Sequence, residues 1–206
     1  YIDTLNEANK VLVSEVSSTL QTIAKDVKIQ IEFNPAMVAE YRLIGYENRV
    51  LRREDFSNDK VDAGDIGAGH TVTALYELTL AGAPGGRIEP LRYAGESRAS
   101  KTNKDEIALL RLRYKLPASD TSKLLEQPIS SADIQAADRM SVDFRFASAV
   151  AGFGQLLRGG KYNENFGYDQ VLALAQNARG KDVFGYRGEF IGLVNLARTL
   201  DVGNSA

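Results

Sequence analysis

One stretch near the middle of the chain constrains its fold more than any other. It begins at Val61 and reads VDAGDIGAGHTVTALYELTL. Apolar and polar residues alternate over residues 71–80, which is the period of a half-buried β-strand. The first half is rich in glycine and aspartate, which predicts a loop that leads into this strand. A half-buried strand needs neighbours, so we expect a β-sheet in the middle of the chain.

Other segments predict further strands, with clear alternation in 26–33 and 110–115 and a looser pattern in 38–46. They cover residues 26–33, 38–46, 88–93, 107–115 and 123–129. The segment 88–93 is expected to be a short edge strand because it contains a proline. The charged segment 49–65 predicts a loop.

Helical spacing occurs at both ends of the chain. Thr4 and Glu7 match a capping box, which predicts a helix from Thr4 to about Ala24. After Ser141 the apolar period changes, and three further helices are predicted over residues 144–157, 168–178 and 186–200. The first of these three has a broad apolar face, so we expect it to be deeply buried.

The order of these segments predicts an α+β fold, because strands and helices are segregated along the chain. We expect an antiparallel β-sandwich over residues 26–132. A helical segment over residues 133–206 is expected to pack on this sandwich around one shared core. Residues 1–25 are expected to form a separate N-terminal piece.

The composition excludes several kinds of partner and chemistry. The 25 lysines and arginines nearly balance the 27 acidic residues, so the net charge of −2 gives no reason to expect nucleic acid as a partner. Because cysteine is absent, disulfides, thiolate metal ligands and cysteine nucleophiles are excluded. No apolar run approaches the roughly 18–20 residues that a membrane-spanning helix needs.

Several long segments resemble a known family. They read AKDVKIQIEFNP, YRLIGYENR, DFSNDKVDAGDIGAGHTVTALYEL, LRYK, DFRFASAVAGFGQLLRG and GYRGEF. In this order they are similar to the C-terminal region, a domain of unknown function, of bacterial proteins that carry a von Willebrand factor type A domain. The opening YIDTLNEANKVL resembles the last strand and last helix of that type A domain. The resemblance therefore implies that residues 1–25 are the C-terminal remnant of a type A domain.

The resemblance also implies a location and sets limits on chemistry. It implies a bacterial protein of the cell envelope or periplasm, and it names no reaction. The metal site of a type A domain begins with an Asp-x-Ser-x-Ser loop, which does not occur in this sequence. No metal role therefore carries over to any residue here, and no cofactor is expected.

The acidic loop offers the first candidate contacts with a ligand or partner. Four side chains of this loop could gather oxygen atoms around calcium, but their spacing does not match an EF-hand: Asn58, Asp59, Asp62 and Asp65. The nearby glycines Gly64, Gly67 and Gly69 precede a strand, whereas the glycines of a phosphate-binding loop precede a helix. His70 is the only histidine and could pair with a carboxylate, but no nucleophile lies in a Gly-x-Ser-x-Gly elbow. A solvated turn is the simpler interpretation of this loop.

A basic row on one strand offers the second set of candidate contacts. Arg111, Arg113 and Lys115 alternate with apolar residues, so they share one face of the predicted strand. Such a row could meet an acidic partner surface. The simpler interpretation is a solvated sheet face.

Two functional hypotheses from different classes follow from these residues. The first is a non-enzymatic protein-interaction or scaffold module that accompanies the type A domain, with a protein as its partner. The alternative is a carbohydrate- or peptide-binding β-sandwich that uses the loop from Asp62 to His70 and nearby tyrosines. A buried pocket formed by aspartate, histidine and tyrosine would favour the alternative, or an unrecognised hydrolase.

The N-terminal helix carries one further prediction. Within a type A domain, the helix from Thr4 to Ala24 would bury its apolar stripe against a parallel sheet. We expect the chain to be a piece of a longer protein, and that sheet is missing from it. Because burying each leucine or valine is worth about 1.5–3 kcal/mol, the stripe is expected to pair with a second copy. The result would be a homodimer caused by truncation.

Overall fold

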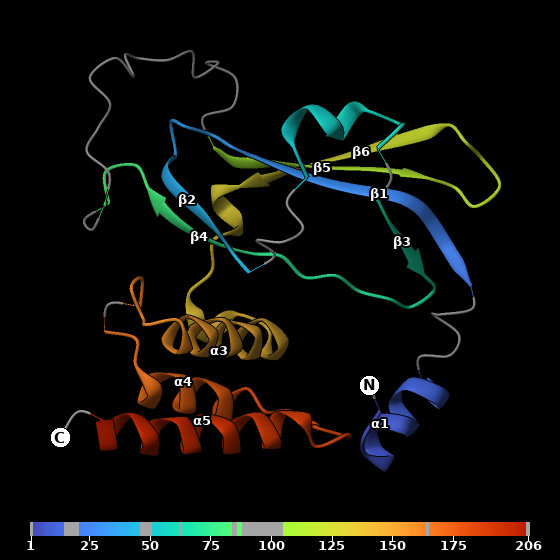
Figure 1. Cartoon of the computed structure of the whole chain (residues 1–206). Helices are drawn as coiled ribbons and strands as arrows, with labels where there is room; N and C mark the ends of the chain where they lie inside the picture. Colours follow the sequence, from blue (N-terminus) through green and yellow to red (C-terminus); the bar gives the residue numbers. More distant parts are fainter. Residues whose placement is uncertain are drawn as a thin grey trace. The chain divides into compact units, whose positions relative to one another are not determined.

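The computed structural model describes residues 2–14, 21–45, 51–61, 63–83, 86–87, 105–163 and 165–204. The chain divides into two compact units (Figure 1). The sheet unit comprises Ala8–Ile134, and the helical unit comprises Tyr1–Glu7 together with Gln135–Ala206. Two antiparallel sheets and several α-helices make up these units, so the predicted α+β class is confirmed. No helix in the described ranges is both long and apolar enough to cross a membrane.

The larger sheet has the strand order β3-β1-β5-β6, and all of its neighbouring strands are antiparallel. Its strands are β1 (Thr22–Phe33), β3 (Gly64–Gly67), β5 (Glu106–Lys115) and β6 (Ser122–Ser130). The strands predicted over residues 107–115 and 123–129 are thereby confirmed as β5 and β6. They form a long hairpin in which β6 is the outer strand (Figure 1).

The smaller sheet consists of β2 (Val38–Ile44) paired antiparallel with β4 (Leu75–Leu80). Aromatic rings join the two sheets. The ring of Phe33, at the end of β1, lies 4.6 Å from the ring of Tyr41 and 5.4 Å from that of Tyr76, measured between centroids. The two antiparallel sheets of the predicted sandwich are therefore present and in contact.

The central strand is shorter than its alternating sequence predicts. Only residues 75–80 form β4, and residues 71–74 are exposed and lie outside any strand. Alternation there creates no buried face, so no neighbouring strand is needed. The preceding glycine-rich segment is not all loop, because Gly64–Gly67 pairs with β1. Backbone pairing with a neighbour overrides the weak strand propensity of glycine.

The predicted N-terminal helix is wrong in its extent. The helix α1 covers only Leu5–Asn9 and continues as a π-helical turn over Lys10–Ser14. Thr22 and Ala24 already belong to β1, where they pair with β3. The β-branched residues near the start of β1 fit a strand better than a helix end. The dimer predicted to form through this helix stays a prediction.

Two other segments complete the sheet unit. The predicted edge strand at residues 88–93 lies outside the described residues. The charged segment predicted to be a loop contains a 3-10 helix, η3 (Arg53–Ser57), whose Phe56 is buried. This single apolar side chain holds a charged turn against the sheet.

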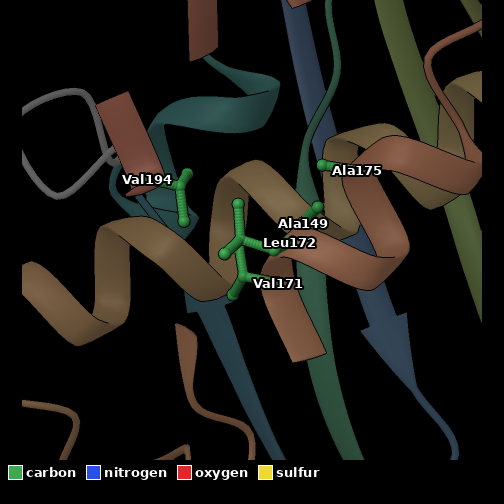
Figure 2. Close-up of a cluster of buried hydrophobic side chains, with 5 residues drawn as sticks. All are labelled: Ala149, Val171, Leu172, Ala175 and Val194. Carbon is green, nitrogen blue, oxygen red and sulfur yellow. The ribbon is translucent and has the colours of Figure 1, made fainter. Parts of the chain in front are cut away.

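The helical unit contains the three predicted C-terminal helices. They are α3 (Val142–Leu157), α4 (Tyr168–Asn177) and α5 (Tyr186–Asn204), and the side chain of Ser141 caps the first of them. Their shared core consists of Ala149, Val171, Leu172, Ala175 and Val194 (Figure 2). The helical unit therefore has an apolar core of its own.

Within the helical unit, α3 is buried on one side only. Phe144, Val150 and Leu157 are 45%, 43% and 61% exposed, respectively. Only Ala149 of this helix is fully buried, because α4 and α5 cover one side of it. The broad apolar stripe of the sequence is therefore only partly used within this unit.

Arg187, near the start of α5, ties the three helices together. Its guanidinium donates to the carbonyl oxygens of Ala178 and Arg179, at 3.1 and 3.2 Å, which follow α4. It also bonds Asp143 of α3 at 2.5 Å and lies over the ring of Phe146. A planar fork of donors suits this set of acceptors, since Nη1 donates to both carbonyl oxygens while Nη2 donates to the Asp143 carboxylate.

Candidate functional site

A groove of about 370 Å³ lies on one face of the larger sheet, beside η3. In Figure 1 the cyan turn η3 lies over β1 and β5. The register of the sheet explains which side chains meet there, because directly paired residues point to the same face. The lining residues are Gln30 of β1, Arg111 and Arg113 of β5, Leu124 and Glu126 of β6, and Arg53, Phe56 and Ser57 of η3.

Positive charge dominates the lining of this groove. Arg111 Nε lies 2.9 Å from an oxygen of Glu126, the one carboxylate among the lining residues. Arg113 Nη2 lies 3.0 Å from both carboxylate oxygens of Asp59, just outside the lining. Arg53 is exposed and has no carboxylate partner in the described part of the chain. The groove thus presents three guanidinium groups to a ligand that arrives from solvent. Among the described residues, that of Arg53 has no carboxylate partner.

Arg113 carries a further unused donor. Its Nε is buried and donates no hydrogen bond within the described ranges. Buried donors are nearly always satisfied in folded proteins, so such an atom beside a groove requires an explanation.

A buried ionic cluster lies next to the groove. The Lys28 side chain is completely buried, and its ammonium donates to the carbonyl oxygen of Asn58 at 2.7 Å. The same ammonium lies 3.2 Å from Asp26 Oδ1, and Lys115 Nζ lies 2.9 Å from Asp26 Oδ2. Burial opposes ionisation of Asp26, but hydrogen bonds from Lys115 and Lys28 outweigh it and lower the pKa of the Asp26 carboxyl.

A local irregularity of β1 makes this cluster possible. Asp26 has a positive φ of 51°, and the pairing of β1 with β5 shifts between Lys25 and Lys28. Aspartate tolerates this left-handed conformation better than most residues. The bulge turns the Asp26 carboxylate toward both lysines.

This cluster and Asp59 fix one wall of the groove. Asn58 and Asp59 directly follow η3, so the Lys28 bond to Asn58 holds the end of that turn. Ser122 of β6 donates to Asp59 Oδ1 at 2.6 Å. The hydrogen bond from Ser122 is the largest cause of the lowered pKa of the Asp59 carboxyl, and the hydrogen bond from Arg113 is the second. These contacts position η3, and with it the backbone that carries Arg53.

The predicted site residues have different fates. Arg111 and Arg113 both line the groove, so the predicted basic row is part of a real concavity. Asp65 accepts a hydrogen bond from the backbone amide of Asp26 at 3.2 Å and lies outside the groove. The His70 side chain is exposed and bonds no side chain in the described residues. Asp62 lies outside the described residues.

Sequence reasoning missed Arg53, Asp26 and Lys28. The available signal for Arg53 was Phe56, because one aromatic residue in a charged loop indicates that the loop packs against something. Asp26 and Lys28 are two positions apart and share a strand face in an ideal strand, but nothing in the sequence marks the bulge. No group of three or more histidine, aspartate or glutamate side chains suited to a metal occurs in the described ranges.

Comparison with known proteins places the chain in a family. Residues 18–200 match the family described as "Uncharacterized protein YfbK, C-terminal". The chain belongs to this family. It is 52% identical over 198 residues to "Uncharacterized protein YfbK" of Escherichia coli (strain K12), which covers 96% of the chain. The predicted membership in a family of bacterial C-terminal regions is thereby confirmed.

The YfbK family gives no reaction for this region. The chain spans only 34%, about a third, of the length of the Escherichia coli relative. No solved structure matches the chain. The chemistry of the groove must therefore be argued from its own residues. Arginine stays protonated at all ordinary pH values, so this lining is suited to binding an anion rather than to transferring a proton.

Proposed function

We propose that this chain is a non-enzymatic protein-interaction module whose arginine groove binds an acidic segment of a partner protein. One observation carries the proposal: Arg53, Arg111 and Arg113 line one groove that holds a single carboxylate, Glu126. The guanidinium fork matches a carboxylate with two parallel hydrogen bonds. Arginine is also enriched among the residues that dominate binding energy at protein interfaces.

The rigidity of the groove supports a binding role. The end of η3 is tied to the sheet through Lys28, and Asp59 is held by both Arg113 and Ser122. A surface that is ordered before binding loses less conformational entropy when the partner arrives. Phe56 and Leu124 add apolar area beside the charges, so the groove favours a partner segment that mixes acidic and apolar side chains.

The proposal extends to the protein around this region. We place the module beside a von Willebrand factor type A domain in a protein of the bacterial cell envelope, where it would position that domain for its own partner. Two findings support this setting. The family is described as a C-terminal region, and the Escherichia coli relative is about three times as long as its match to this chain, which covers 34% of it. The sequence YIDTLNEANKVL resembles the end of a type A domain.

The alternative carbohydrate- or peptide-binding function of the Asp62 to His70 loop has no contact in its favour. Asp65 is engaged with the backbone of β1, and His70 is exposed. Neither residue lines the groove. Within the described residues 63–70, this loop shows no convergent set of side chains that would favour the alternative over the groove.

Binding of a probe peptide tests the proposal. The probe has about eight residues, which is within the usual length of a strand. Valine occupies every second position, and the positions between are glutamate and glutamine alternately. We expect the intact chain to bind a fluorescent probe by anisotropy. Arg53→Glu should weaken binding about tenfold or more, a loss of roughly 1.4 kcal/mol or greater. A control peptide with lysine in place of glutamate should not bind.

The neighbouring residue supplies a matched control. Arg52 is also exposed, but it does not line the groove, so Arg52→Glu changes the net charge equally. We expect Arg52→Glu to leave the affinity within about twofold, because a charge beyond the site is largely screened at physiological salt. Equal losses in both variants, no binding of the probe, or equal competition by a single-stranded oligonucleotide would contradict the proposal.

A further inference from the structure

We infer that the acidic segment binds as an added β-strand along the free edge of β6, with its acidic side chains over the arginine groove. This inference rests on the proposed function and specifies how the partner is held. Adding a strand to an exposed sheet edge is a general way to bind extended peptides. Main-chain hydrogen bonds supply affinity, and alternate side chains supply specificity.

The strand order leaves one long edge free. β6 pairs with β5 along one side, and no described strand pairs with its other side. An edge strand presents unpaired amide and carbonyl groups to any further strand. At the opposite edge of the sheet, β3 is only 4 residues long, whereas β6 has 9. β6 therefore offers the longer template.

The side chains of β6 are those of a surface that an added strand would cover. Leu124 and Leu125 are 55% and 48% exposed. As neighbours in a strand they point to opposite faces, so only an element at the edge itself could contact both. Two exposed leucines on an edge strand are unusual, because edges are commonly protected by charge or proline.

Charge and proline protect only part of β6, because Lys123 and Glu126 flank the two leucines and Pro128 blocks one end. Pro128 has no amide hydrogen, and the side chain of Gln127 donates to its carbonyl oxygen at 3.0 Å. The free template is therefore the part from Ser122 to Gln127. This part is also the one that borders the groove, because Leu124 and Glu126 line it.

The position of the groove explains why the added strand should be acidic. The added strand would lie one strand spacing beyond β6, so its backbone would be about 10 Å from the backbone of β5. Every second side chain of the added strand would face the groove. A glutamate and an arginine reaching toward each other span this distance, so Arg113 would contact a carboxylate on the added strand. Like charges directly opposite each other destabilise a sheet. The acidic residue should therefore lie opposite Leu124, and an uncharged residue opposite Glu126.

A second copy of this chain fits the same edge less well. An antiparallel pair of β6 strands would bring two arginine grooves side by side. Juxtaposed like charges disfavour such an interface. The charge of the groove instead selects an acidic partner segment as the occupant.

Hydrogen exchange of the intact chain tests the inference with the same probe peptide. We expect alternate amides between Ser122 and Gln127 to exchange at least tenfold more slowly when the probe is bound. A probe that is N-methylated at every residue keeps its charges and cannot donate main-chain hydrogen bonds, so we expect it to bind at least tenfold more weakly. Both results together support strand addition.

The outcomes separate this inference from the proposed function. If both probes bind equally, lose affinity in Arg53→Glu and leave β6 exchange unchanged, the groove binds acidic segments and strand addition is wrong. If neither probe binds at millimolar concentration, both proposals are contradicted. If β6 is protected without a probe, and more so at higher protein concentration, a second copy occupies the edge and the inference is overturned.

Discussion

Replacing Asp26 with asparagine should destabilise the sheet unit strongly. The carboxylate of Asp26 is 8% exposed and faces two ammonium groups, those of the fully buried Lys28 and of Lys115. Asparagine has nearly the same shape and tolerates the positive φ of 51° at this position. The substitution therefore removes the charge without disturbing the backbone, and leaves Lys28 buried without a counterion.

The expected size of this effect follows from the contacts. Removing one partner of a buried ion pair typically costs 3–5 kcal/mol. Two features place Asp26→Asn near about 3 kcal/mol, the lower end of that range. Lys28 keeps its bond to the Asn58 carbonyl oxygen at 2.7 Å, and Lys115 is 16% exposed and can turn toward water. The exposed Asp105 of the sheet unit supplies a control, and Asp105→Asn should change stability by less than about 0.5 kcal/mol.

Hydrogen exchange of amides in β1 and β5 measures this loss in the whole chain. It reports the opening of the sheet unit separately from that of the helical unit, which has its own core. Adding Lys28→Met to Asp26→Asn should restore part of the stability, because no buried charge then remains. An unchanged exchange rate in Asp26→Asn, or strictly additive effects in the double variant, would refute the account of this cluster.

Three further predictions concern packing in the helical unit, the hydrogen bonds of Arg187 and the effect of pH. Gly152→Ala should cost the helical unit about 1–3 kcal/mol, because a methyl group there would overlap the ring of Phe166. A methyl group at Gly154 would meet no atom within 4 Å, so Gly154→Ala should stabilise the helical unit slightly. Thermal melts followed by circular dichroism compare the two variants. Arg187→Lys should cost about 1–2 kcal/mol in the same assay, since one ammonium cannot replace both Nη1, which bonds Ala178 and Arg179, and Nη2, which bonds Asp143; an unchanged melt would contradict this role. Because the folded pKa of Asp59 is lowered, its contribution to stability is fully present above about pH 4 and is lost as the pH falls through that lower folded pKa. The urea midpoint of the sheet unit should therefore fall on acidification, less steeply in Asp59→Asn, and a midpoint that rises would refute this sign.

Local periodicity was sufficient where a segment is long and has one buried face. Residues 110–115 alternate between apolar and basic side chains, and the strand predicted over 107–115 is β5; the three C-terminal helices lie where helical spacing predicts them. It failed where pairing decides the structure. Residues 71–74 alternate but have no partner strand, whereas Gly64–Gly67 has weak strand propensity and forms β3 because β1 lies beside it. Periodicity describes a face, and only the tertiary fold determines what covers it.

The candidate site was predictable to the same degree. Arg111 and Arg113 share a strand face, so their common position followed from period two alone. Arg53 joins them only because η3 folds back on the sheet, which depends on the burial of Phe56 and on contacts beyond the turn. The role of Asp26 depends on a bulge and a positive φ, and neither has a distinctive sequence pattern.

The most direct test of the central claim locates the bound peptide on the protein. Nuclear magnetic resonance of the arginine side chains, recorded while the probe peptide is added, reports each guanidinium separately. The account predicts saturable shifts of the Nε–H signals of Arg53, Arg111 and Arg113, with the Arg52 signal unchanged. Shifts confined to other arginines, or no saturable shift in these three, would contradict the claim that the groove is the binding surface.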